Sequence, residues 1–272
     1  MIRLRPVLKI TYAALFIGLN ILLTRLVGLA QVGAFFSWAR IAPGTSVTIF
    51  ASIFLGPLYG ALVGVAGDAL GWLLLGQFTG TFNFFLSIYY ALMGCLPFFI
   101  FKGFTSLKKS YLKWGALWVL VVLLGLFATL GIWLSKGVEN ILLKANFELN
   151  VARIVLTIIT FVFLCGSILV SILVGRKQKD KKMQMMADAT LGDCFGVSLS
   201  YELIAALLKP VAFIAFYSLI LGNSLEAATG VDYLTIVVLT LIFACVNIPL
   251  NAFLLSLYFR YGNILVRGKT NE

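Results

Sequence analysis

The residues that could do chemistry in this sequence are charged side chains set inside long apolar runs. Asp68, Glu202 and Lys209 each lie well within such a run. A charge is costly in a bilayer and marks a ligand, an ion path or a polar partner on a neighbouring helix. Two interpretations of Asp68 and Lys209 stay open: structural pairing, in which Lys209 is matched with Asp68 or Glu202, or contact with a bound molecule.

Uncharged polar residues follow a helical spacing in the run 80–101. Asn83, Ser87 and Tyr90 stand at i, i+4 and i+7, with Tyr89 alongside, so they share one helix face. A further polar group, Asn247, Pro249 and Asn251, predicts a kink with interhelical hydrogen bonds in the run 233–258. The sequence therefore predicts polar faces inside the bundle.

Two arginines accompany an aromatic segment between the first two apolar runs. Arg25 lies near the end of the first run, and Arg40 closes a segment that holds Phe35 and Trp38. One interpretation is an interfacial aromatic belt with snorkelling arginines. The other is an aromatic lid whose guanidinium groups meet an anionic ligand.

Missing residue types exclude several classes of function. The chain has no His, which excludes Ser-His-Asp triads and HExxH zinc sites. The four Cys are scattered without metal-ligand spacing, so we expect buried thiols and no metal or other cofactor. No P-loop motif is present, and no inverted repeat is evident. We therefore expect no enzyme activity; without His or clustered carboxylates, a lipid-modifying enzyme is disfavoured.

The elements that must position these residues are membrane helices. Of 272 residues, 61% are hydrophobic and only 11% are charged, which indicates an all-α polytopic membrane protein with one domain, 1–272. About 20 apolar residues cross a bilayer. The run 44–75 is interrupted by Gly56-Pro57, which predicts helices over 44–55 and 57–75 because proline breaks a continuing helix. With these two, we expect six to eight membrane segments; the other runs are 10–31, 80–101, 114–134, 152–174, 198–221 and 233–258.

Glycines line one face of the predicted helix 57–75. Gly60, Gly64, Gly67 and Gly71 follow the i, i+4, i+7, i+11 spacing, which lets a neighbouring backbone approach closely. Asp68 lies on or beside this stripe.

The net charge of +11 comes largely from basic clusters that flank the apolar runs. Because Lys and Arg of short loops favour the cytoplasm, both termini are predicted to be cytoplasmic, and the basic charge does not indicate nucleic-acid binding. A cleaved signal peptide over 1–30 is disfavoured, since its long apolar stretch contains Asn20 and Arg25. On the inner side, the prediction places Arg3, Arg5, Lys9, Lys102, Lys108, Lys109, Lys113, Arg176, Lys177, Lys179, Lys181, Lys182, Arg260, Arg267 and Lys269.

The run over residues 40–72, RIAPGTSVTIFASIFLGPLYGALVGVAGDALGW, resembles the substrate-binding (S) subunits of energy-coupling factor (ECF) vitamin transporters. In that family a short helix ends at a GP turn, and a glycine-striped helix with Asp follows. Residues 15–29, LFIGLNILLTRLVGL, look most like the folate branch, which has an Arg at the position of Arg25. Ala14 and Gly18 match the family's small-xxx-small surface for docking on the coupling subunit.

The resemblance implies a subunit that binds its vitamin from outside with high affinity, under the first outer loop. It implies three partners, a transmembrane coupling subunit and two ATP-binding subunits, in a prokaryotic plasma membrane. The likeness covers residues 10–101; a possible extra helix pair, 114–174, and a basic cytoplasmic loop, 175–197, lie beyond it. For a folate-like ligand, the expected site is Arg25, Arg40, Phe35, Trp38, Asp68, Asn83, Ser87, Tyr90 and Lys209.

A stand-alone secondary transporter or channel is the alternative function. In that case Asp68, Glu202 and Lys209 carry protons or ions, and transport needs no partner.

Overall fold

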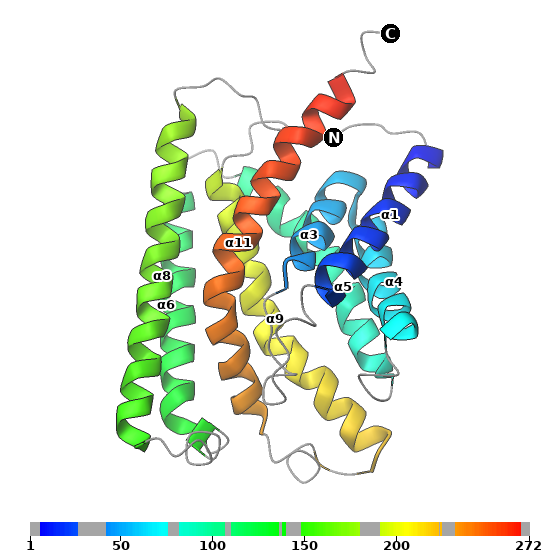
Figure 1. The fold of residues 1–272 in the computed structure, drawn as a ribbon. Coiled ribbons are helices and arrows are strands. Elements are labelled where there is room, and N and C mark those ends of the chain that lie inside the picture. The colour runs from blue at the N-terminus through cyan, green and yellow to red at the C-terminus, as the bar shows by residue number, and fades with distance from the viewer. Residues whose placement is uncertain are drawn as a thin grey trace.

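The computed structural model describes residues 6–26, 42–75, 82–106, 110–135, 138–139, 148–179, 191–222, 224 and 232–267. This part of the chain is helical throughout and holds no strand (Figure 1). Its elements are α1 (Pro6–Ile21), the π-helical turn η1 (Leu22–Leu26), α3 (Gly44–Leu55), α4 (Pro57–Leu75), α5 (Phe84–Ser106), α6 (Ser110–Leu134), α8 (Leu149–Lys179), α9 (Leu191–Leu219) and α11 (Tyr233–Arg267).

Six helical segments in the described ranges are long and apolar enough to cross a membrane. They are Pro6–Thr24, Pro57–Leu74, Phe84–Ser106, Leu149–Gly166, Gly192–Leu219 and Tyr233–Tyr261. Two shorter apolar helices accompany them, Gly44–Leu55 and Trp118–Leu134. The predicted helical membrane bundle is therefore confirmed, and the chain has the length and composition of a multi-pass membrane protein.

The break between α3 and α4 falls where the sequence predicts it. α3 ends at Leu55, Gly56 adopts φ 106°, and α4 begins at Pro57. Glycine, which has no Cβ, adopts this positive φ without steric cost, and proline suits the first helical position because its missing N–H would have no partner there. The turn lets a 12-residue helix fold back beside the next one.

Several helices run beyond the predicted apolar spans. α8 continues to Lys179 and α9 begins at Leu191, so the predicted basic loop 175–197 is helical at both of its ends. Hydropathy marks only the part of a helix that lies in hydrocarbon, whereas backbone hydrogen bonding continues into the polar flank.

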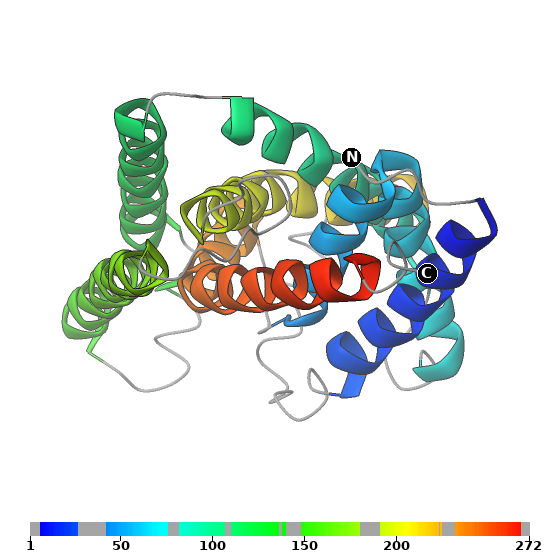
Figure 2. The ribbon, with the colours of Figure 1, turned by 90° about the horizontal axis from the view of Figure 1, so that it is seen from above.

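α9 and α11 lie between two groups of helices. Figure 2 shows α6 and α8 on one side and α1, α3, α4 and α5 on the other. The short helix α3 is almost wholly buried: Val47 is 1% exposed, and Ile49 and Ala51 are fully buried. By contrast α6 and α8 expose many large apolar side chains, as Trp118 and Phe161 do, which suits contact with lipid.

Close contact between α4 and α5 depends on glycine. A Cβ atom on Gly60 would collide with the carbonyl oxygen of Gly94, and one on Gly64 would collide with the carbonyl oxygen of Tyr90. These two members of the predicted stripe therefore face α5, as expected for small residues at a membrane helix interface. Gly67 faces the side chain of Asn20 on α1 instead.

A buried serine of α3 hydrogen-bonds the backbone of α5 beside a proline. Pro97 lies inside α5 and lacks an amide hydrogen. The fully buried Ser52 accepts a hydrogen bond from the backbone N–H of Phe98 at 3.3 Å and donates to the carbonyl oxygen of Cys95 at 3.4 Å. Side chains of neighbouring helices commonly satisfy backbone groups that proline frees in membranes.

The described basic residues gather mainly at one end of the bundle. α1 begins, and α5, α8 and α11 end, at the upper end in Figure 1, and the described basic residues Lys9, Lys102 and Arg260 belong to these helix ends. Glu139 and Asp232 lie at the opposite end. The membrane side that each end faces stays a prediction from the Lys and Arg bias.

Candidate binding cavity

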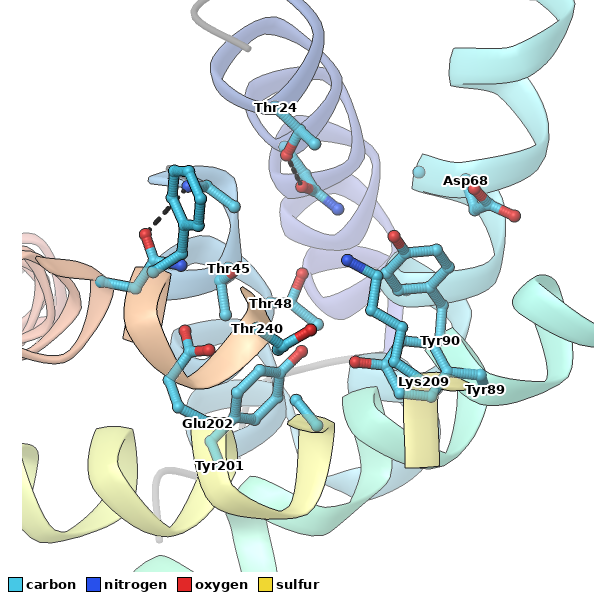
Figure 3. A pocket seen from close by; sticks show the side chains of 17 residues that line it. Thr24, Thr45, Thr48, Asp68, Tyr89, Tyr90, Tyr201, Glu202, Lys209 and Thr240 are labelled. Atoms are coloured by element: carbon cyan, nitrogen blue, oxygen red, sulfur yellow. Dashed lines mark hydrogen bonds between the residues drawn. The ribbon is translucent and has the colours of Figure 1, made fainter. Parts of the chain in front are cut away.

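A polar and aromatic cavity lies inside the bundle, between α1, η1, α3, α4, α5, α9 and α11 (Figure 3). Its empty space is about 820 Å³, counted out to the surroundings at its opening. The lining residues are Asn20, Thr24, Ala42, Thr45, Thr48, Gly64, Gly67, Asp68, Tyr89, Tyr90, Tyr201, Glu202, Ala205, Lys209, Thr240, Phe243 and Asn247.

The last turns of α1 form one wall. Thr24, in the π-helical turn, donates to Oδ1 of Asn20 at 2.8 Å. Both side chains pack against glycines: a Cβ on Gly44 would collide with Thr24 and Asn20, and one on Gly67 would collide with Asn20. Single-turn π-helices are frequent at functional sites, because the extra residue redirects a side chain.

Asp68 accepts a hydrogen bond from a residue of α5. Ser87, which is 5% exposed, donates to Oδ2 of Asp68 at 2.8 Å. The carboxylate of Asp68 points away from the centre of the cavity in Figure 3. The predicted interhelical polar contact of Asp68 is thus present, with Ser87 as a partner.

Glu202 accepts a hydrogen bond from a residue of α11. The carboxylate is 5% exposed, and Nδ2 of Asn251 donates to its Oε1 at 3.2 Å. One turn earlier on α11, Oδ1 of Asn247 accepts the backbone N–H of Ala42 at 3.1 Å. The predicted hydrogen bonds of Asn247 and Asn251 to other elements are therefore confirmed.

Lys209 brings the positive charge. It lies seven residues after Glu202 on α9, and its positive charge acts on the Glu202 carboxylate. Figure 3 shows the lysine side chain beside Tyr89 and Tyr90, with its nitrogen facing the cavity. An ammonium group has three N–H donors, so it can serve several acceptors at once.

The structure brings together three residues of the predicted site, Asp68, Tyr90 and Lys209, and ties Ser87 to them through Asp68. Asn83 does not line the cavity. It lies at the start of α5, where its Oδ1 accepts the N–H of Leu86 at 3.2 Å, as a helix-capping side chain does.

The side chains of four further residues of that prediction lie outside the part of the chain that the structure describes. The backbone of Arg25 belongs to η1, next to the lining residue Thr24, but its side chain lies outside the described part. Phe35, Trp38 and Arg40 lie outside the described residues altogether.

Sequence reasoning left most lining residues out of the predicted site. Asn20 and Thr24 carried a usable signal, since two polar residues at i, i+4 in an apolar run share a face. Glu202 carried one also, since it lies at i, i+7 from Lys209, which the prediction did include. The threonines of α3 and Thr240 gave no sequence signal, because single hydroxyl groups are common in membrane helices.

Ala14 and Gly18, the predicted docking pair, lie on an exposed face of α1. A Cβ on Gly18 would meet no atom within 4 Å. This small-residue surface is therefore not used for packing among the described residues.

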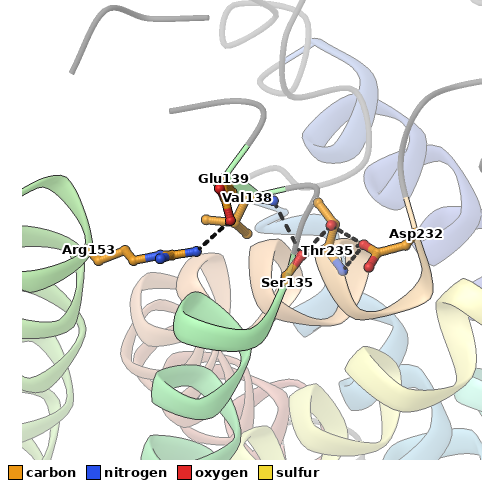
Figure 4. A network of polar contacts seen from close by, with 6 residues as sticks. All are labelled: Ser135, Val138, Glu139, Arg153, Asp232 and Thr235. Carbon is orange, nitrogen blue, oxygen red and sulfur yellow. Dashed lines mark hydrogen bonds and ion pairs between the residues drawn. The ribbon is translucent and has the colours of Figure 1, made fainter. Parts of the chain in front are cut away.

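A second polar cluster joins the ends of α6, α8 and α11 (Figure 4). Asp232 accepts the N–H of Thr235 at 2.8 Å and hydrogen-bonds its hydroxyl, and Ser135 donates to Asp232 at 3.3 Å. Arg153 pairs with Glu139 at 3.1 Å. These bonds cap α11 and connect it to the α6–α8 pair, which is a structural role.

Comparison of the chain with protein-family models, with curated proteins and with solved structures gives no match.

Proposed function

We propose that this chain is the substrate-binding subunit of an ATP-driven uptake transporter of the ECF type. In this proposal it binds a vitamin or vitamin precursor related to folate from outside a prokaryotic cell, and it hydrolyses no ATP itself. Its partners are a transmembrane coupling subunit and two ATP-binding subunits. The observation that carries the proposal is the polar, aromatic cavity enclosed by membrane helices.

The composition of the cavity supports a ligand with a flat ring and polar groups. Three tyrosines, Tyr89, Tyr90 and Tyr201, offer ring faces and hydroxyl groups to the same space. Aromatic rings stack on flat heterocycles, and a small number of placed polar groups orients a ligand. Lys209 offers donors to a carboxylate, which folate-like molecules carry.

The exposed pair Ala14 and Gly18 supports a partner subunit. Small residues at i, i+4 let two membrane helices approach closely, and this pair is left uncovered by the described helices. In the proposal the coupling subunit packs here.

Ligand binding by the purified chain tests the proposal. Calorimetry in detergent, against vitamins that include oxidised and reduced folates, should give one-to-one binding without ATP or partner subunits. Absence of binding across that panel would contradict it.

Docking is tested by uptake into proteoliposomes that hold the chain, the coupling subunit and the ATP-binding subunits. Replacing both Ala14 and Gly18 by Trp should abolish uptake and leave ligand binding intact. The matched control replaces Val122 and Leu126, an exposed apolar pair at the same spacing on α6, by Trp. Joint loss of binding and uptake, or no change in either, would show that the assignment of this surface is mistaken.

A stand-alone secondary transporter is the second candidate, and the observation that favours it is Glu202, a carboxylate buried in the cavity wall. Such residues mark proton and ion paths in membranes. Uptake by the chain alone, driven by a proton gradient and stopped by a protonophore, would select this candidate. Uptake that needs ATP and the partner subunits would exclude it.

A further inference from the structure

Two opposite charges share one face of α9. Glu202 and Lys209 are seven residues apart, close to two full helical turns, so they point in similar directions and are separated by about 10 Å along the axis. Both line the cavity.

The space between the two charges is lined by hydroxyl groups and rings. In Figure 3 the hydroxyls of Thr48, Tyr201 and Thr240 lie between the carboxylate of Glu202 and the nitrogen of Lys209. Tyr89 and Tyr90 flank the lysine. A flat molecule placed here meets aromatic faces along its length and a different charge at each end.

The surroundings of Glu202 make a ligand contact favourable. Asn251, a neutral amide, donates to Oε1 of Glu202 and fixes the carboxylate, and the positive charge of Lys209 acts on it from two turns away along α9. A buried charge is costly unless it is paired and hydrogen-bonded. A positively charged or strongly donating group on a ligand can add a charge-assisted hydrogen bond to Glu202, and a ligand carboxylate can add one to Lys209.

We propose that the cavity binds an amphoteric aromatic molecule, with its anionic end at Lys209 and a cationic or N–H donor end at Glu202. This inference rests on the proposed function, since it takes the cavity to be the binding site of the transported solute. The inference adds to that function a ligand with opposite charges at its two ends. It also states which end of the ligand lies at Lys209 and which lies at Glu202.

The first experiment is calorimetry on the purified full chain with four probes of different charge. Folate has carboxylates at one end and an aminopyrimidine donor edge at the other; biotin is anionic, thiamine is cationic and riboflavin is uncharged. We expect folate to bind most tightly. Glu202→Gln and Lys209→Gln should each weaken folate binding about tenfold or more, the loss typical of a hydrogen bond to a charged group.

The variants are chosen to keep the fold. Gln at 202 retains an oxygen that accepts the bond from Asn251, and Ser218→Ala, at an exposed position of the same helix, is the control. Folding of each variant is checked by its melting temperature in detergent. Unchanged folate affinity in folded Glu202→Gln or Lys209→Gln protein would overturn the inference.

The outcomes separate the two proposals. Tighter binding of biotin, thiamine or riboflavin than of folate would overturn the amphoteric ligand and leave a vitamin-binding subunit in place. If none of the four binds, the proposed function fails, and thermal stabilisation by para-(aminomethyl)benzoate, para-toluate and benzylamine decides the inference. Stabilisation by the amphoteric compound alone, lost in both Gln variants, would support it; equal effects of the three compounds would overturn it.

Discussion

At the scale of single residues, several buried polar groups are matched across helices. Asp68 accepts from Ser87, Glu202 accepts from Asn251, and Ser52 serves two backbone groups of α5. In hydrocarbon an unmatched polar group finds no water, so each pair also fixes the register between two helices. The same pairs hold the walls of the cavity in place.

The contact between Ser87 and Asp68 yields a stability prediction. Ser87→Ala removes a donor from a partly buried carboxylate and should lower the free energy of unfolding by about 1 kcal/mol, the scale of interhelical hydrogen bonds in membranes. Thermal unfolding in detergent measures the change. Ser106→Ala, which removes an exposed hydroxyl bonded within its own helix, is the control and should have little effect. Equal effects of the two variants would contradict a role of Asp68 in joining α4 to α5.

At the scale of helices, the fold depends on close approach between α4 and α5 and on the termination of α3. Gly56 and Pro57 turn the chain, and Gly60 and Gly64 then allow contact with the backbone of α5. That contact brings Tyr89 and Tyr90 to the cavity beside Asp68. A local glycine pattern thereby sets the position of aromatic side chains on another helix.

Glycine substitutions in α4 and α5 should have opposite signs. Gly64→Ala places a methyl group against the carbonyl of Tyr90 and should destabilise the protein by about 1–3 kcal/mol through overpacking. Gly103→Ala has open space and should be neutral or stabilise α5 by up to about 1 kcal/mol through helix propensity. Melting temperatures of both variants test this. A destabilised Gly103→Ala together with an unaffected Gly64→Ala would refute the packing described.

The hydrogen bonds that cap α11 lead to a second prediction at the scale of helices. Asp232→Ala removes the acceptor of the Thr235 amide and of the Ser135 hydroxyl, so it should cost about 1 kcal/mol of stability, typical of a lost helix cap. Asp232→Asn retains an oxygen acceptor and should recover most of that loss. Thermal unfolding compares the two variants, and equal destabilisation would argue against capping as the cause.

At the scale of the whole molecule, basic residues gather mainly at one end of the bundle, and the cavity lies within its helices. The basic residues at the ends of α1, α5, α8 and α11 lie opposite Glu139, Glu148 and Asp232. In short loops this bias orients a membrane protein with its basic end in the cytoplasm. α6 and α8 stand apart from the cavity, and none of their described side chains lines it.

Orientation is tested by cysteine labelling in intact cells. In a variant whose four cysteines are replaced by Ser, Glu148→Cys should react with a membrane-impermeant maleimide added outside, and Lys102→Cys should not. Both positions are exposed and lie at opposite ends. The reverse pattern would overturn the predicted cytoplasmic termini.

The sequence by itself determined the class of the protein and the order of its helices. Apolar runs, the Gly56-Pro57 break and the glycine spacing are local signals, because hydrocarbon requires every span to satisfy its own backbone. Only the tertiary structure decided which polar residues meet. Asn251 lies 49 positions from Glu202 and Ala42 lies 205 positions from Asn247, and no local pattern links such pairs. Asn83 shows the same limit: its spacing matches that of Ser87 and Tyr90, yet it caps α5, because its position at the helix start gives its oxygen a nearby backbone donor.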